Sequence, residues 1–453
     1  MSILHLIRQQ AEQRPNSLAF IATDTNEKLT YAELCDRFDA LARWLKERGC
    51  RAHERCGLLF PEGIEFPVHA LAILSAGMCV APIGLFMPRS EVDFFIQGAQ
   101  LHWLLGAERQ LIRFPFAGSV DSANDESFRA TNPAYIRFTS GTTATRKGVL
   151  LGHPTIVERL AAADEMLKIT PSDRIWFRLP MADHFVVSVL LYLSRGATLI
   201  LTREDSGIVD VMTNFNPTII YGSPESYRAL IAAEAGELNS VRLAISTTAS
   251  LSGKLQNLFG ARFSRSLNPA LGIIEVGLLT LNTRPEKANS VGPAMPAYEL
   301  TLVGPDGAPV SPGEVGELFV KGPGLLDAYL NPWRGRSEIL SKYGYSTGDM
   351  AYLDQEQFLI LAGRNKSRLK VDGLSFFCEE VEAVIDAIPG IKESRVFLDD
   401  KTRLLAAELV ADEIVISGLA ERLAGQLDRR KIPLTFKRVT SLPRTPNGKL
   451  LRR

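Results

Sequence analysis

Residues 136–153 read IRFTSGTTATRKGVLLGH, and this stretch says most about the fold and function of the chain. Apolar runs typical of β-strands stand on either side of a short polar segment. That segment begins with five residues that carry a hydroxyl group or no side chain: Thr139, Ser140, Gly141, Thr142 and Thr143. Backbone N–H groups in such a turn, its hydroxyl groups and the ammonium group of Lys147 all bind phosphate oxygens. The pattern predicts a phosphate-binding loop between two strands, with a polar hairpin turn as the alternative.

The spacing of glycine and lysine in this stretch excludes a P-loop. A P-loop reads GxxxxGK[ST] and opens a helix. Here Gly141 to Lys147 reads GxxxxxKG, and the run VLLG that follows is typical of a second strand. The predicted loop therefore belongs to another kind of nucleotide site.

The composition is that of an ordinary globular protein. Of 453 residues, 46% are hydrophobic and 23% are charged, and 51 basic residues balance 51 acidic ones, which argues against a nucleic-acid partner. The five cysteines form no CxxC pair and no signal-peptide pattern is present, so we expect a cytoplasmic protein. The run without charges between Glu65 and Arg89 is interrupted by Gly77 and Pro82. It predicts a core helix followed by a buried strand, and no membrane span.

Strand-like and helical patterns alternate along most of the chain. Thr30 and Glu33 form a capping box before a helix with one apolar face, and CGLLF (56–60) is typical of a buried strand. Such alternation predicts an α/β domain of mainly parallel sheets flanked by helices. Gly- and Pro-rich hairpin patterns begin near residue 295, and beyond a polar, basic connector at 363–373 a small α+β module is expected.

Five segments resemble, in order, the signatures of the AMP-forming adenylating superfamily, which contains acyl- and aryl-CoA synthetases, adenylation domains of peptide synthetases and luciferases. The first, TSGTTATRKGV (139–149), is close to TSGTTGxPKGV. The others are GELFVKGPGLLDAYLN (316–331), YSTGDMAYLD (345–354), GRNKSRLKVDGLSFFCEEVEAVI (363–385) and PRTPNGKLLRR (443–453). The resemblance covers nearly the whole chain.

The resemblance implies two domains and a two-step reaction. Residues 1–366 would be the adenylation domain that binds ATP and the acid, and residues 367–453 a mobile domain that pivots at Ser367. An acid would first react with ATP and Mg²⁺ to give acyl-AMP. The acyl group would then pass to the pantetheine thiol of CoA or an acyl carrier protein.

The resemblance also assigns residues to the nucleotide. The loop from Thr139 to Thr143 and Lys147 would hold pyrophosphate. Asp349, expected in a turn formed by Thr-Gly-Asp (347–349), would hold the ribose diol, and Arg364 the ribose or a phosphate. The family has YGxTE where this chain reads Leu271-Gly272-Ile273-Ile274-Glu275, so Leu271 and Gly272 would cover the base and Glu275 would bind Mg²⁺. The aromatic residue and the hydroxyl group of that motif are missing, and Ala144 stands where the loop signature has glycine.

The acid and the thiol are assigned in the same way. Lys449 would be the catalytic lysine, and His184 lies near the place of a gating residue. Four residues, two of them aromatic, would border the acid: Asp183, His184, Tyr221 and Gly222. Val186 stands where members that take amino acids have aspartate, so an aryl or conjugated acid is favoured, with a fatty acid as the alternative.

The thiol half-reaction is assigned to the C-terminal module. Gly373 matches the glycine beside the pantetheine tunnel, and the basic run at 428–453 suits phosphates or an acidic carrier protein. Two alternatives stay open. One is a ligase that makes only the adenylate, and the other is a binding protein whose active site has decayed.

Overall fold

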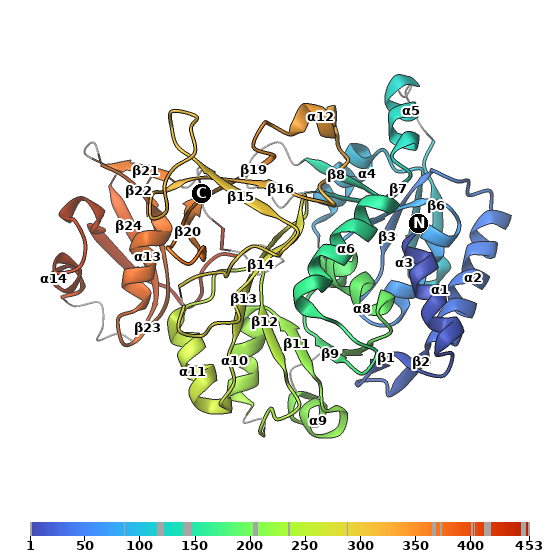
Figure 1. Cartoon of the computed structure of the whole chain (residues 1–453), viewed down its shortest axis with the longest axis horizontal. Helices are drawn as coiled ribbons and strands as arrows, with labels where there is room; N and C mark the ends of the chain where they lie inside the picture. The colour runs from blue at the N-terminus through green and yellow to red at the C-terminus, as the bar shows by residue number, and fades with distance from the viewer. Residues whose placement is uncertain are drawn as a thin grey trace.

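The computed structural model describes most of the chain. The residues outside it are 1, 86, 116–121, 139–146, 203–206, 234–235, 288, 365–367, 372–373, 400–401, 403, 412–417, 445–449 and 452–453, together with the side chains of 122–124, 368 and 375. Figure 1 shows the N-terminal helices at one end of the long axis and the C-terminal strands and helices at the other.

Two eight-stranded sheets form most of the molecule. The first has the order β14(Gly277–Leu281), β13(Asn268–Ile273), β12(Leu243–Ser246), β11(Ile219–Gly222), β9(Arg174–Phe177), β10(Thr198–Leu201), β1(Leu18–Ala22), β2(Glu27–Thr30). The second has the order β18(Trp333–Gly335), β17(Ala328–Leu330), β8(Gly148–Gly152), β7(Pro133–Phe138), β4(Cys79–Pro82), β3(Arg55–Leu59), β5(Trp103–Gly106), β6(Leu111–Arg113). Their central strands are parallel, and antiparallel strands complete their edges.

Three smaller sheets follow. They are β15(Glu299–Val303), β16(Gly316–Lys321), β19(Tyr345–Leu353), β20(Leu359–Arg364); then β21(Arg368–Val371), β22(Leu374–Phe377); and then β23(Ile391–Leu398), β24(Leu405–Ala411), β25(Thr435–Arg438). The helices are α1(Ile3–Gln13), α2(Tyr31–Glu47), α3(Glu65–Ser75), α4(Arg89–Ala99), α5(Ser122–Ala130), α6(His153–Leu167), α7(Met181–His184), α8(Leu190–Ser194), α9(Ile208–Asp210), α10(Pro224–Ala232), α11(Gly253–Phe263), α12(Arg336–Ile339), α13(Cys378–Asp386) and α14(Leu419–Ala424), with a π-helical turn at Phe185–Val189.

Strand alternation places helices on both faces of each large sheet. In β9, Ile175 and Phe177 belong to the main core, whereas Trp176 belongs to a second core with residues of α10 and α11. In β7, Tyr135 faces the main core and Ile136 faces the opposite side. Because side chains alternate across a strand, a sheet that is apolar on both faces must be covered on both. The result is alternating layers of helices and sheets.

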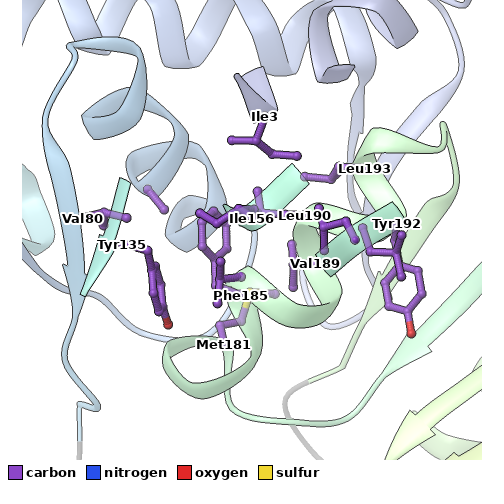
Figure 2. Close-up of a cluster of buried hydrophobic side chains, with 14 of the residues drawn as sticks. Ile3, Val80, Tyr135, Ile156, Met181, Phe185, Val189, Leu190, Tyr192 and Leu193 are labelled. Atoms are coloured by element: carbon purple, nitrogen blue, oxygen red, sulfur yellow. The ribbon is translucent and has the colours of Figure 1, made fainter. Parts of the chain in front are cut away.

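The layer between the two sheets is the main core (Figure 2). It gathers side chains from α1, α6 and the π-helical turn against strand residues such as Val80 and Tyr135. Phe185, Val189 and Leu190 are fully buried here. The segment expected to border the acid is thus anchored by the core.

The C-terminal strands and helices have a core of their own. Fourteen buried residues between Phe376 and Ile432 form this cluster, among them Val381, Ile385 and Leu409. Lys254 of α11 donates to the backbone carbonyl of Ile391 across the two parts, at 3.4 Å. The expected α/β fold with a small α+β module is confirmed.

Local predictions largely hold, with two corrections. The Thr30–Glu33 capping box and the core helix α3 are present, and no helix among the described residues is long and apolar enough to cross a membrane. However, the Thr-Gly-Asp segment is not a turn: it bulges within β19, where the register against β16 shifts. The connector at 363–373 contains the end of β20 and the first strand of the β21–β22 pair. The sequence between those strands, Asp372-Gly373, is typical of a hairpin and was not used to predict one.

Candidate functional site

Several predicted residues lie outside the described part of the chain. They are the loop residues Thr139, Ser140, Gly141, Thr142 and Thr143, the hinge Ser367, the tunnel residue Gly373 and the catalytic Lys449. The strands that flank the loop are described. β7 ends at Phe138 and β8 begins at Gly148, so strands stand on either side of the loop as predicted, and the two strands pair antiparallel.

Lys147 lies beside an aromatic ring. Its Nζ atom is 4.7 Å from the centroid of the Tyr329 ring. Tyr329 comes from β17, which pairs with β8 so that Tyr329 stands opposite Val149. A lysine at this distance from a tyrosine ring is attracted to its face. The pairing of β17 with β8 therefore fixes the end of the predicted phosphate loop.

Glu275 reaches the same tyrosine from another part of the chain. It is 8% exposed, and its Oε1 atom accepts from the Tyr329 hydroxyl group at 3.5 Å. The hydroxyl groups of Tyr329 and Tyr345 are 2.8 Å apart. Burial, and next the Glu275 carboxylate, raise the pKa values of Tyr329 and Tyr345, so both stay protonated at neutral pH. These hydroxyl groups can therefore act as donors toward the carboxylate.

A buried arginine holds the backbone of the turn between β13 and β14, which carries Glu275. Arg159 of α6 is 2% exposed and donates to the carbonyl oxygens of Ile274 at 2.9 Å and of Gly324 at 2.6 and 3.0 Å. Burial lowers the pKa of Arg159 to about 10, which still leaves it charged at neutral pH. Gly324 has φ +66°, and a Cβ atom there would lie 2.5 Å from that of Arg159. Glycine is therefore needed where this segment meets α6.

Leu271 and Gly272 lie at the end of β13, next to this turn. Leu271 is partly buried and Gly272 is exposed. A Cβ atom at Gly272 would lie 3.1 Å from the carbonyl oxygen of Gly277 on the paired strand. This close approach explains the glycine without reference to a nucleotide.

Asp349 and Arg364 face each other across β19 and β20. They are register partners, and Arg364 Nε donates to Asp349 Oδ1 at 3.0 Å. The Asp349 side chain is 7% exposed and the Arg364 side chain 60% exposed. The arginine compensates the buried charge of the aspartate. Asp349 lies on β19, the strand that also carries Tyr345, the hydrogen-bond partner of Tyr329.

The segment expected to border the acid is held by side chains of β7. Arg137 Nη2 donates to Asp183 Oδ1 at 2.7 Å, and its Nη1 donates to the Asp183 carbonyl oxygen. Tyr135, two residues earlier on the same face of β7, donates to the carbonyl oxygen of Ala182 at 3.1 Å. The strand that leads into the predicted phosphate loop thus also grips α7.

His184 and Tyr221 meet within an aromatic group. Their ring centroids are 5.9 Å apart and the rings are nearly perpendicular, while Tyr221 stacks on Phe177 at 6.0 Å. Gly222 ends β11, and a Cβ atom there would lie 2.9 Å from that of Ser226. Val186 is fully buried in the core. Aromatic rings predominate in this region, with the Arg137–Asp183 ion pair and the Ser188 hydroxyl group beside them.

The described residues offer one carboxylate suited to the predicted metal. They contain no group of three His, Cys, Asp or Glu side chains that could hold an ion. Mg²⁺ is, however, often bound by one or two carboxylates together with substrate phosphates. The buried Glu275 carboxylate, close to Lys147 through Tyr329, fits that mode of binding.

Comparison with known protein families identifies the family of the chain. The family model described as AMP-binding enzyme matches residues 7–330. The chain belongs to this family. The AMP-forming resemblance drawn from the motifs is confirmed.

Curated relatives of the chain include both peptide synthetases and CoA ligases. A dimodular nonribosomal peptide synthase of Bacillus subtilis is 25% identical over the whole chain, but the chain spans 21% of that synthase. A feruloyl-CoA synthase of Amycolatopsis is 26% identical, with 94% of the chain and 92% of the synthase covered. Among solved structures, ATP-bound MatB of Rhodopseudomonas palustris superposes with a TM-score of 0.86 at 24% identity, covering 99% of this chain and 97% of that one. The structural likeness shows the shared fold.

Four residues of the site were given no role from the sequence. Tyr329 and Tyr345 stand in the quoted segments at 316–331 and 345–354, which was a usable signal. Arg137 lies in the stretch 136–153 and Arg159 lies outside all the quoted segments, and neither role was visible because their partners are distant in sequence.

Proposed function

We propose that the protein activates a carboxylic acid with ATP and transfers the acyl group to a thiol. In the first step a carboxylate oxygen bonds to the α-phosphorus and the bond to pyrophosphate breaks, which gives acyl-AMP. In the second step a thiolate attacks the acyl carbon and AMP leaves. The observation that carries the proposal is the convergence of Lys147 and Glu275 on Tyr329, because it joins three distant segments around a place for a polyphosphate.

The nucleotide is assigned to the region around Tyr329 and β19. The hydroxyl-rich loop and Lys147 would hold pyrophosphate as a leaving group in line with the attack. Asp349 would accept from the ribose diol, and Arg364 would pair with Asp349 and contact the ribose or a phosphate. Leu271 and Gly272 would cover the base. Bound through Glu275, Mg²⁺ would neutralise charge on the phosphates.

The acid is assigned to the region bordered by Asp183, His184, Tyr221 and Gly222. The stacked Phe177 and Tyr221 rings and the edge of His184 support an aryl or conjugated acid. The likeness to a feruloyl-CoA synthase agrees with this choice. A fatty acid is the second candidate, since the same region is largely apolar.

The thiol step is assigned to the C-terminal module. Residues 367–453 would turn about Ser367, which withdraws Lys449 from the adenylate and brings the tunnel residue Gly373 to it. The separate core of the module supports its movement as one body. The acceptor would be CoA or the phosphopantetheine arm of a carrier protein.

Acid-dependent exchange of pyrophosphate into ATP tests the first step. We expect exchange with at least one acid from a panel of aryl, cinnamic and fatty acids, and a thioester by mass spectrometry when CoA or a carrier protein is added. Exchange without any thioester would identify a ligase that makes only the adenylate. No exchange with any acid, together with retained ATP binding, would identify a binding protein and overturn the proposal.

A further inference from the structure

Two buried tyrosines connect segments that sequence treats separately. Tyr329 belongs to β17 and Tyr345 to β19, and their hydroxyl groups are 2.8 Å apart. Tyr329 is 5% exposed and Tyr345 7%. A buried hydroxyl group is costly unless it is hydrogen-bonded, so this contact needs a partner for each proton.

The proton count limits the direction of the hydrogen bonds. Each tyrosine hydroxyl group has one proton to donate. In one arrangement Tyr329 donates to Glu275 Oε1 at 3.5 Å and its oxygen accepts from Tyr345 at 2.8 Å. Tyr345 also lies in hydrogen-bonding range of Glu275. We adopt the first arrangement, in which Tyr329 passes the polarisation on to the carboxylate.

The ring of Tyr329 serves a second charged group. Lys147 Nζ lies 4.7 Å from the centroid of this ring. Lys147 directly precedes β8, the strand that pairs with β17. The hydroxyl end of Tyr329 thus meets an anion while its ring meets a cation. One side chain therefore sets the spacing between the two charges.

We propose that Tyr329 is a positioning residue that holds Glu275 through its hydroxyl group and Lys147 through its ring, so that both act on one polyphosphate. This inference rests on the proposed function. Tyr345 supports it by fixing the Tyr329 hydroxyl group. In this arrangement the hydroxyl group, through Glu275, sets how much Mg²⁺ increases the affinity for ATP. The ring, through Lys147, contributes to the affinity for ATP in the absence of Mg²⁺.

Direct binding of ATP to the full chain, with Mg²⁺ and with EDTA, separates these two parts. Tyr329→Phe keeps the ring and removes the hydroxyl group, so the gain in affinity from Mg²⁺ should fall about five- to tenfold while affinity in EDTA stays unchanged. Tyr329→Leu should in addition weaken binding in EDTA by about two- to fivefold. Tyr345→Phe should lower the Mg²⁺ gain by about two- to threefold.

Tyr343→Phe is the matched control. Tyr343 is partly buried, and its hydroxyl group donates to the carbonyl oxygen of Gly307 at 3.2 Å, a contact that does not involve Glu275. In Tyr343→Phe the increase in ATP affinity on adding Mg²⁺ should equal that of the wild type. Thermal unfolding of every variant shows whether a change in binding follows from loss of fold.

Two outcomes of the binding measurements would contradict the inference. An equal loss in Mg²⁺ and in EDTA for Tyr329→Phe would overturn the inference, as would an unchanged Mg²⁺ gain in a folded variant. If Tyr329→Phe does not fold, the same criteria apply to Tyr345→Phe. If the wild-type protein binds ATP and performs acid-dependent exchange, the proposed function stands whatever the tyrosine variants do.

Discussion

The nucleotide side and the acid side of the site are built differently. Around Tyr329, polar groups of four segments meet: the buried Glu275 and Tyr345 contact its hydroxyl group or lie beside it, and the exposed Lys147 lies over its ring. Around Tyr221, aromatic rings pack together and one ion pair, Arg137–Asp183, holds the segment in place. In sequence, the nucleotide side departs from the family signatures at Ala144, Leu271 and Ile274, whereas Val186 on the acid side differs only from the members that take amino acids.

The difference reflects what each side would recognise. A triphosphate offers charges in fixed positions, and a satisfied polar network holds opposing charges at fixed spacing. An apolar acid offers mainly surface, and packed rings can be exchanged at small cost as long as volume is preserved. Changes on the nucleotide side should therefore affect every acid equally, and changes on the acid side should alter the choice of acid.

The largest effect is expected from Lys449, which lies outside the described residues and is proposed to act on both the nucleotide and the acid. Lys449→Ala should reduce acid-dependent ATP–pyrophosphate exchange by about two to three orders of magnitude, because the lysine would offset charge at the reacting centre. Supplied with preformed acyl-AMP, the variant should still transfer the acyl group to a thiol. An equal loss of both activities would show that Lys449 is not confined to the first step.

Arg137→Met tests whether the acid side depends on its ion pair. Removing the arginine leaves Asp183 without its cation and should cost about 2 kcal/mol of stability, below the value for fully buried pairs because both side chains are 18% exposed. We expect KM for the acid to rise about tenfold and KM for ATP to change much less.

A surface pair provides the control for Arg137→Met. Arg129 pairs with Asp125 at 2.9 Å on α5, and its side chain is 61% exposed. Arg129→Met should change neither stability nor KM measurably, since exposed pairs contribute little. An equal rise in KM for ATP and the acid in Arg137→Met would show that β7 orders both sides at once.

The smallest effect concerns a carboxyl group outside both sides. Burial, with Glu382 and Glu393 nearby, raises the pKa of Asp386 to about 7. Because the folded pKa exceeds the unfolded one, this group stabilises the fold most at low pH, and that stability is lost as pH rises from about 4 through 7. Asp386→Asn should therefore raise the melting temperature at pH 8 by a few degrees, relative to the wild type, and change it little at pH 4. A constant difference across that range would exclude titration of Asp386 as its cause.

The sequence predicted the elements better than the contacts. Capping boxes and apolar periodicity are local, and the Thr30–Glu33 capping box and the strands on either side of the loop formed as predicted. The Thr-Gly-Asp segment did not, because strand pairing with β16 overrode its turn preference. The motif residues Lys147 and Glu275 were found from signatures, but their shared contact with Tyr329 was not visible in the sequence.

What the sequence by itself determined is the order of strands, helices and signature segments, and with it membership of the family, since these depend on local pattern. Only the tertiary structure decided which charges compensate one another. Arg159 binds carbonyl oxygens of Ile274 and Gly324, Arg137 holds Asp183, and Tyr329 meets both Lys147 and Glu275. These contacts join residues far apart along the chain, and their geometry depends on how two sheets and a layer of helices pack.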